Sequence, residues 1–335
     1  MNRRRKLKKK DKLNIVLVLL MLVGCISLVM LLISLWENRQ YKPEDAGGEG
    51  NVYIEPVIKE AKKVTYEGKT YTQKKHVESY LLLGVDNHGN LSEFSGVYGP
   101  QADVQIVLVI DNDNKTWRLL QLNRDSMVNV RVMNEMGDFL GYTYEQLAFA
   151  HAQGDGSIMS AKNNMLTVSE LLWEQPINGV AAINMDSIGI LTDAVGGVTV
   201  NITQDFVDLN DNFKVGQDVT LNGEMALQFI RTRSHTDIEA NLARMARQRE
   251  FMKSFIKQFA KLDENAILET YGEIVKYMNT DIGSGVMLAL AEKIKDYTEL
   301  SLMTIDGESE IKDVYVEYTL DKDSLDHTIL ELFYE

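Results

Sequence analysis

Cysteine is almost absent from this chain of 335 residues, since Cys25 is the only one. The rest of the chain therefore cannot use disulfide bonds, and its stability must come from a hydrophobic core of ordinary size. The sequence also lacks a Gly-x-Ser-x-Gly motif, a Walker loop and a Cys/His array with zinc-ligand spacing. These absences argue against a serine hydrolase, a P-loop nucleotide-binding protein and a zinc-stabilised domain.

Positive charge is scarce outside the first twelve residues. The net charge is −14, and residues 1–12 hold eight Lys or Arg and one Asp, which leaves −21 for residues 13–335. A surface this acidic repels the phosphate backbone of nucleic acids. We therefore expect no nucleic-acid partner, and any local cluster of arginines becomes conspicuous.

The longest uncharged run is residues 13–36, which follow the basic tail 1–12 directly. Its length suffices for a helix that crosses a bilayer, which needs about 20 apolar residues. Basic residues stay on the cytoplasmic side, so the chain after Trp36 is expected outside the cell, attached to the membrane by a single retained signal anchor. Residues 37–40 offer no small-residue cleavage site. An alternative is lipidation of Cys25, since residues 22–25 resemble a lipobox, and this also leaves the domain tethered outside.

Residues 37–63 are predicted to be a linker that includes the acidic stretch 43–50, and residues 64–335 an extracytoplasmic catalytic domain. Strands are expected at 80–85, 104–110, 116–122, 180–184, 198–202, 300–304 and 314–318, with a hairpin at 64–71. Helices are expected at 142–151, 159–173, 186–194, 223–230, 242–262, 285–297 and 322–334. This alternation predicts an α/β fold with a mixed central β-sheet sandwiched by helices.

Arginines gather between residues 231 and 248. Arg231 and Arg233 are two apart, so they share a face if the chain is extended there, whereas Arg244, Arg247 and Gln248 lie on one face of a helix. Guanidinium groups present rigid donors that match phosphate oxygens, so two such clusters suit a ligand with more than one phosphate. The alternative is a solvated helix with scattered surface arginines.

Two aspartates, Asp86 and Asp103, stand at the ends of predicted strands. If these strands are neighbours, both carboxylates emerge at one edge of the sheet, where they could bind Mg²⁺ together with substrate phosphate. Aspartates at such positions also serve as turn or cap residues. Arg124 and Asp125 could form a local ion pair. His151 could be a general base or could have a structural role beside its loop glycines.

Six segments taken in order resemble the LytR–CpsA–Psr family of cell-envelope proteins. They are residues 81–86, 101–103, 119–125, 193–200, 221–227 and 231–248, and the resemblance covers about residues 80–255. It implies an α/β sandwich and a membrane-anchored phosphotransferase that moves anionic glycopolymers, such as teichoic acid or capsule, from polyprenyl-pyrophosphate carriers to peptidoglycan.

The resemblance also implies roles for individual residues. Asp86 and Asp103 would hold Mg²⁺ (or Mn²⁺) on the pyrophosphate, and Asp125 would orient Arg124. The expected phosphate-binding residues are Arg124, Arg231, Arg233, Arg244 and Gln248, with Arg247 close by. The expected catalytic residues are Asp86, Asp103, Arg124, Arg231 and Arg233.

Three positions depart from the family's usual pattern. Gln101 replaces an arginine and removes a phosphate donor, Val104 replaces a threonine, and Asn241 stands where aspartate is common. If Gln101 merely weakens the site, Gln101→Arg should strengthen it. These departures keep two alternatives open, a non-catalytic binder of polyprenyl-pyrophosphate lipids or cell-wall glycans, and a pyrophosphatase that uses water. A transcriptional attenuator conflicts with the charge of −21.

Overall fold

The structure is a computed structural model that describes residues 61–87, 99–134, 136–203, 213–232, 238–312 and 315–335. All of them belong to one compact unit, Glu49–Glu335. Among these residues no helix is both long and apolar enough to span a bilayer. The predicted span 13–36, Cys25 and nearly all of the predicted linker lie outside the described residues.

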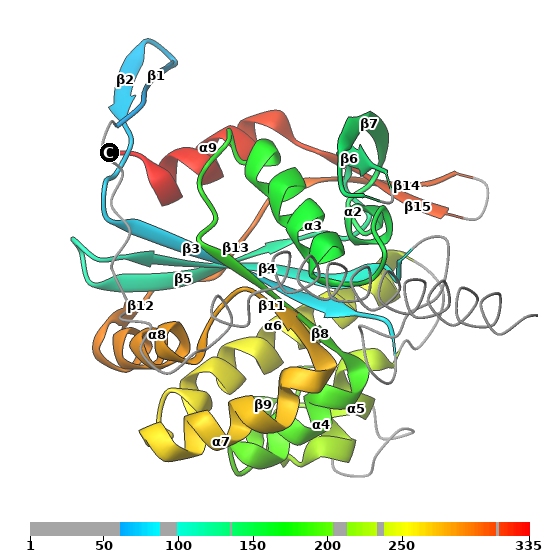
Figure 1. Ribbon diagram of the computed structural model, residues 1–335, viewed down its shortest axis with the longest axis vertical. Coiled ribbons are helices and arrows are strands. Elements are labelled where there is room, and N and C mark those ends of the chain that lie inside the picture. The colour runs from blue at the N-terminus through cyan, green and yellow to red at the C-terminus, as the bar shows by residue number, and fades with distance from the viewer. Residues whose placement is uncertain (1–60, 88–98, 135, 204–212, 233–237, 313–314) are drawn as a thin grey trace, which may run out of the picture. The chain divides into compact units, whose positions relative to one another are not determined.

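A seven-stranded mixed sheet forms the centre of the fold (Figure 1). Its order is β11 (Met278–Thr280), β8 (Gly179–Asn184), β3 (Val77–Val85), β4 (Ala102–Asp111), β5 (Thr116–Leu122) and β12 (Thr298–Glu299), and β13 (Met303–Thr304) also pairs with β5. The pairs β3–β4, β4–β5 and β8–β11 are antiparallel, whereas β3–β8 and the pairs of β5 with β12 and β13 are parallel. The predicted mixed sheet is confirmed.

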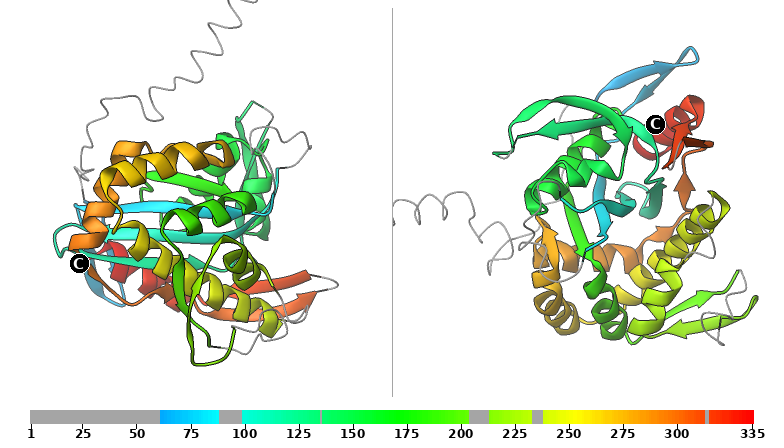
Figure 2. Two further views of the ribbon diagram at one scale, coloured as in Figure 1. Left: turned by 90° about the horizontal axis from the view of Figure 1, so that it is seen from below. Right: turned by 90° about the vertical axis from the view of Figure 1, so that its right-hand side faces the viewer.

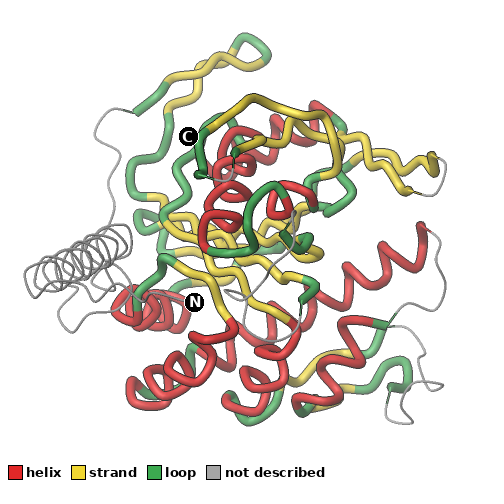
Figure 3. Tube along the Cα trace, turned by 45° about the vertical axis from the view of Figure 1, so that its right-hand side comes forward, coloured by secondary structure: helices red, strands yellow, loops and turns green. Residues whose placement is uncertain are grey.

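Helices cover both faces of this sheet, as Figure 3 shows. One face packs against α3 (Ile158–Leu171) and α9 (Lys322–Phe333), and its core includes Leu81, Leu83 and Val107. The other face packs against α4 (Met185–Ala194), α6 (Ile238–Phe259), α7 (Glu264–Ile274) and α8 (Ser284–Asp296), with Tyr80, Ile106 and Leu108 in its core. Successive strand side chains point to opposite faces, so a sheet covered on both sides needs the nearly continuous apolar runs seen in β3 and β4.

Four hairpins and three short helical segments surround this sandwich (Figure 2). The hairpins are β1 (Lys63–Tyr66) with β2 (Lys69–Thr72), β6 (Met127–Met133) with β7 (Phe139–Gln146), β9 (Val198–Asn201) with β10 (Asp218–Leu221), and β14 (Gly307–Lys312) with β15 (Tyr315–Leu320). The short segments are α2 (Phe149–Ala152), α5 (Gly223–Arg231) and η3 (Val275–Tyr277). The predicted hairpin at 64–71 is confirmed, with positive φ angles at Glu67 and Gly68.

Two local predictions are wrong. Residues 142–146, expected in a helix, belong to β7, because alternating Tyr and Thr side chains favour a pleated strand that pairs with β6. Arg231, expected in an extended segment, is the last residue of α5, since the helical bond from Thr232 N to Gln228 O is still made. Only Thr232 has extended dihedral angles there, and Arg233 lies outside the described residues.

Candidate active site at the edge of the central sheet

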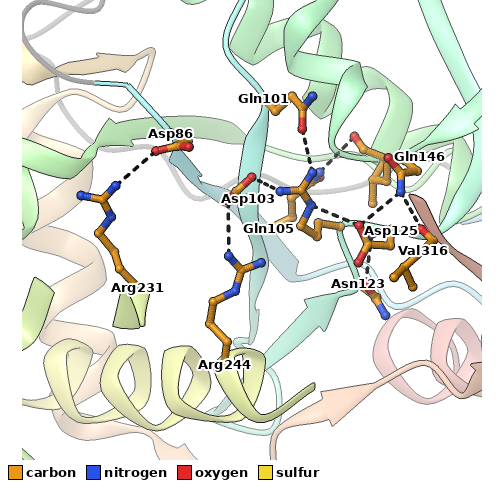
Figure 4. Close-up of polar contacts among 12 residues, drawn as sticks. Asp86, Gln101, Asp103, Gln105, Asn123, Asp125, Gln146, Arg231, Arg244 and Val316 are labelled. Carbon is orange, nitrogen blue, oxygen red and sulfur yellow. Dashed lines mark hydrogen bonds and ion pairs between the residues drawn. The ribbon is translucent and has the colours of Figure 1, made fainter. Parts of the chain in front are cut away.

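The two predicted aspartates come together where β3 ends and β4 begins. Because these strands are antiparallel, Val85 pairs with Ala102, and Asp86 N donates to Gln101 O at 3.2 Å. Asp86 and Asp103 point toward the same space in Figure 4, with Arg231 and Arg244 approaching from α5 and α6. The sequence therefore located this edge of the sheet correctly.

Asp103 lies between two guanidinium groups. Its Oδ1 accepts from Arg124 Nη1, and its Oδ2 lies 3.6 Å from Arg244 Nη1. The side chains of Asp103, Arg124 and Arg244 are only 13%, 14% and 6% exposed. Two partly desolvated cations thus flank one buried carboxylate and compensate its charge.

Arg124 makes a further hydrogen bond and a further ion pair. Its Nη2 donates to Gln101 Oε1 at 2.7 Å, and its Nε lies 3.2 Å from Asp125 Oδ1. Asp125 in turn accepts from Gln146 Nε2 at 3.3 Å, and Gln146 Nε2 also donates to Val316 O at 2.6 Å (Figure 4). Asp125 thus lies beside Arg124, and its role in orienting this guanidinium stays a prediction.

Gln146 is a residue of the site that sequence reasoning missed. It is the last residue of β7, and it links the loop that carries Asp125 to β15. Its side chain is only 8% exposed, although it shares a face of β7 with the exposed Tyr144, because it contacts Asp125 and Val316 where the strand ends. A strand assignment for residues 139–146 would have placed a polar side chain at this strand end, close to Asp125.

The rim of the site is formed by Asp86 and Arg231. Asp86 Oδ1 lies 3.9 Å from Arg231 Nη2, and their side chains are 55% and 47% exposed. An ion pair at this distance and exposure is weak, so a ligand can displace it at little cost in free energy. Arg231 is therefore the most accessible guanidinium among the described candidates.

Arg247 and Gln248 lie beneath this rim. Arg247 Nε donates to Phe229 O at 2.7 Å, and Nη2 donates to Thr232 O, so the side chain binds carbonyls at the C-terminal end of α5. Burial lowers the pKa of Arg247 to about 10, which leaves it charged at neutral pH. Gln248 Nε2 donates to Ile230 O at 3.3 Å. Both side chains support the helix that carries Arg231, and their binding of phosphate stays a prediction.

His151 is fully buried, which favours its structural role. Its Nδ1 lies 2.7 Å from Pro100 O, so the ring can donate to the segment that precedes Gln101. Desolvation lowers the pKa of His151 to about 4, so the imidazole is neutral under ordinary conditions. A ring without solvent access is poorly placed to take a proton from a substrate.

Asp193 also has a structural role. Its Oδ1 accepts from Gly223 N at 2.8 Å, at the start of α5. A Cβ atom on Gly223 would lie 2.7 Å from Gly189 O, so α4 and α5 approach more closely than any larger residue permits. The segments 193–200 and 221–227 thus set the position of α5, and through it that of Arg231.

The carboxylates at this edge fit a hard divalent cation. Asp86 is exposed, and the oxygens of Asp103 keep acceptor capacity beyond their two ion pairs. Mg²⁺ commonly uses only one or two protein carboxylates and takes water and substrate phosphate as further ligands. The described residues contain no group of three or more His, Cys, Asp or Glu that could hold a metal without a substrate.

An apolar cavity of about 170 Å³ extends from this site between the sheet and α4, α6, α7 and α8. Gly84, Val104, Ile230 and Gln248 line it close to the charged residues, and Tyr80, Ile274 and Ile294 line it farther along. Gly84 faces Val104 so closely that a Cβ would lie 3.0 Å from Val104 Cβ. Val104 is one of the three residues that depart from the family's usual pattern. Because it directly follows Asp103 and lines the cavity, the apolar wall reaches the charged site.

Comparison with known proteins identifies the relatives of this chain. The profile of the LytR_cpsA_psr family matches residues 50–333. A protein of Oceanobacillus iheyensis, named polyisoprenyl-teichoic acid--peptidoglycan teichoic acid transferase TagU, is 28% identical over 243 residues, which are 71% of this chain and 69% of the relative.

Solved structures share the fold. A crystal structure from Enterococcus faecalis, described as a transcriptional regulator, has a TM-score of 0.58 at 26% identity and covers 76% of this chain and 86% of its own. A structure described as TagT bound to LI-WTA has a TM-score of 0.58 at 22% identity, with 86% and 97% covered. At that identity the second match is informative about the fold alone.

Proposed function

The chain belongs to the LytR–CpsA–Psr family, and we propose that it transfers an anionic glycopolymer from a polyprenyl-pyrophosphate carrier to peptidoglycan outside the membrane. Curated relatives bear names of teichoic acid transferases, which supports a transfer reaction of this kind. The basic tail 1–12 and the uncharged run 13–36 support a single-pass anchor with the domain on the outer side.

The observation that carries this proposal is the meeting of an apolar cavity with a cluster of arginines. Ile230 and Gln248 line the cavity, and Arg231 and Arg244 come from the same two helices. A ligand that satisfies both parts has a long apolar tail and a polyanionic head. A polyprenyl pyrophosphate has this form, because its chain is hydrocarbon and its head carries two phosphates.

The described residues suggest how the reaction proceeds. A primary hydroxyl of peptidoglycan attacks the phosphorus of the sugar-linked phosphate, and a new phosphorus–oxygen bond joins polymer to peptidoglycan. The bond from this phosphorus to the bridging oxygen breaks, and polyprenyl phosphate leaves with the electron pair. Arg231, Arg244 and Arg124 stabilise the charge on the phosphoryl oxygens, usually the largest catalytic contribution in such sites.

The proton of the attacking hydroxyl needs an acceptor, and we assign it to Asp86. Asp86 is exposed at the rim, whereas both oxygens of Asp103 already face guanidinium groups. Asp86 and Asp103 would also hold Mg²⁺ or Mn²⁺, which would neutralise charge on the pyrophosphate.

Equilibrium binding of three ligands to the full-length chain tests whether the apolar cavity and the arginine cluster bind one ligand together. We expect a prenyl pyrophosphate to bind more tightly than either inorganic pyrophosphate or the matching prenyl alcohol, and its affinity to rise with tail length. Each buried methylene contributes about 0.8 kcal/mol until the cavity is full. If tail length has no effect on affinity, the cavity does not bind the carrier.

A pair of variants makes this test specific. Ala181→Leu fills the cavity from β8 and should weaken binding of the long-tailed ligand while leaving inorganic pyrophosphate unaffected. Ala266→Leu, at a partly buried position of α7 that does not line the cavity, is the matched control. Equal effects of both variants would point to a general loss of stability.

A further inference from the structure

Strand β7 presents a row of large side chains to solvent. Leu140, Tyr142 and Tyr144 are 66%, 54% and 64% exposed, at alternate positions of one strand. Side chains two apart lie on the same face and about 7 Å from one another. Neighbouring exposed aromatic residues of this kind mark interaction surfaces more often than single ones do.

This row continues from the candidate active site. Gln146, Tyr144 and Tyr142 share one face of β7, and Gln146 Nε2 donates to Asp125, which is paired with Arg124. In the hairpin register Tyr144 lies opposite Asn129 and Tyr142 opposite Arg131. A linear ligand that lies along Tyr142 and Tyr144 is therefore directed toward Asp125 and Arg124.

The ring of Tyr142 is held in place. It packs edge-on against Phe139, with ring centroids 5.0 Å apart, and the guanidinium of Arg131 lies 4.3 Å from the Phe139 ring centre. Arg131 is fixed by Glu170 of α3, and Arg131 N donates to Thr167 Oγ1 at 3.3 Å. Such a stack loses little conformational entropy when a ligand binds.

Charge decides which ligand fits this surface. Residues 127–146 contain one basic residue, Arg131, and three acidic residues, Glu135, Asp138 and Glu145, so the hairpin carries −2. The only base is already paired with Glu170. An anionic polymer or an anionic bilayer is repelled here. An uncharged carbohydrate is not, and the apolar C–H face of a pyranose stacks on a tyrosine ring while its hydroxyls reach amides such as that of Asn129.

We propose that the outward face of β7, centred on Tyr142 and Tyr144, binds an uncharged glycan strand and directs it toward Asp125 and Arg124. Resting on the proposed function, this strand is the acceptor, so the anionic donor binds at the arginines and the glycan approaches along β7. The same face would then set the minimum length of an efficient acceptor, because two tyrosines along one strand span more than one sugar.

Titration of the full-length chain with a β-1,4-linked hexamer of N-acetylglucosamine tests this proposal. The hexamer should bind, and Tyr142→Ala with Tyr144→Ala should weaken binding by roughly tenfold or more. The variants Tyr142→Phe and Tyr144→Phe keep the rings and should retain most of the affinity. Tyr315→Ala, at a tyrosine of β15 that is 63% exposed, is the matched control and should bind as the unchanged chain does.

Three results would overturn the proposal. They are no binding of the hexamer by the unchanged chain, unchanged binding by the double alanine variant, and binding of phosphatidylglycerol vesicles through these tyrosines without hexamer binding. The titration needs neither lipid carrier nor turnover. Hexamer binding that persists in a chain without transferase activity would therefore contradict the proposed function alone, and transfer without a role for these tyrosines would contradict this inference alone.

Discussion

The guanidinium of Arg124 contacts a different acceptor with each of its three nitrogens. Nη1 and Nη2 donate to Asp103 and Gln101, Nε lies 3.2 Å from Asp125 Oδ1 as an ion pair without a hydrogen bond, and Asp125 is itself fixed by Gln146. Arg124 therefore neutralises Asp103 and orders the loop that follows β5. Gln101, which departs from the family's usual arginine, contributes as an acceptor and not as a donor to phosphate.

This contact reverses the expectation for Gln101→Arg. A second guanidinium would face that of Arg124, and like charges about 4 Å apart repel by about 4 kcal/mol at an effective dielectric constant of 20. We expect Gln101→Arg to reduce transfer by roughly tenfold or more. Gln101→Glu keeps an acceptor oxygen and is the matched control. A gain of activity in Gln101→Arg would show that Arg124 does not depend on this acceptor.

Substitution of Arg231 should affect transfer activity without affecting the stability of the fold. Because its pair with Asp86 is loose and exposed, Arg231→Ala should change the free energy of unfolding very little. Loss of a charge-assisted contact to phosphate costs about 1.5–3 kcal/mol, so transfer should fall by roughly 10- to 150-fold. Lys253→Ala removes an exposed cation from α6 away from the site and is the control. Equal turnover in both variants would remove Arg231 from the phosphate site.

Because the imidazole of His151 is buried, we expect the stability of the fold to depend on pH. Its pKa is about 4 in the folded chain against an ordinary 6.5, so the unfolded chain binds more protons between these values. The contribution of neutral His151 is complete above pH 6.5 and is lost as pH falls toward 4, by roughly 3 kcal/mol in all. Chemical unfolding measured from pH 7 to pH 4 should show a smaller loss for His151→Gln. Identical pH profiles would mean that the ring is not desolvated.

At the scale of elements, α5 connects the family segments to the site. Its first residues pack on α4 through Gly189 and Gly223, Asp193 accepts from Gly223 N, and Arg247 binds its last carbonyls. The position of Arg231 is therefore fixed at both ends of one short helix. Segments with no reactive side chain, such as 193–200, contribute to the site in this indirect way.

Two glycines in helices test this packing. Gly223→Ala would place a Cβ within 2.8 Å of backbone atoms of Gly189, so we expect a loss of about 1–3 kcal/mol in unfolding free energy. In Gly272→Ala, on α7, the new Cβ meets nothing within 4 Å, and the substitution should stabilise the chain by up to about 1 kcal/mol. Urea unfolding of both variants checks the contrast. Similar values for the two would contradict the close contact of α4 and α5.

Periodicity predicted the elements of the sandwich well but not those around it. β3 and β4 are buried on both faces, so their apolar runs are unmistakable. β6 and β7 bury one face only, and β7 was therefore mistaken for a helix, which concealed Gln146 and the row of tyrosines. Asp86 and Asp103 were found because strand ends meet at a sheet edge. The carbonyl partners of Arg247 were not found, because their position depends on the packing of α5 against α6.

At the scale of the whole molecule, positive charge and accessible apolar groups are concentrated in a few regions. The first twelve residues carry +7 and the remainder −21, and the arginines of the site stand out against that acidic background. One apolar cavity reaches this site from the sheet interior, and one aromatic row reaches it along β7. A donor with an anionic head and an uncharged acceptor would therefore approach Arg124 by different routes.

The most direct measurement is the product analysis of a single reaction. The full-length chain is mixed with a polyprenyl-pyrophosphate-linked glycopolymer and a divalent cation, with and without a peptidoglycan oligomer. We predict that polymer becomes linked to the oligomer through a phosphodiester, with one polyprenyl phosphate released per link and little release without oligomer. Release that is equal with and without the oligomer would indicate hydrolysis by water, and binding without release would indicate a non-catalytic carrier protein. Either result would contradict the transferase account.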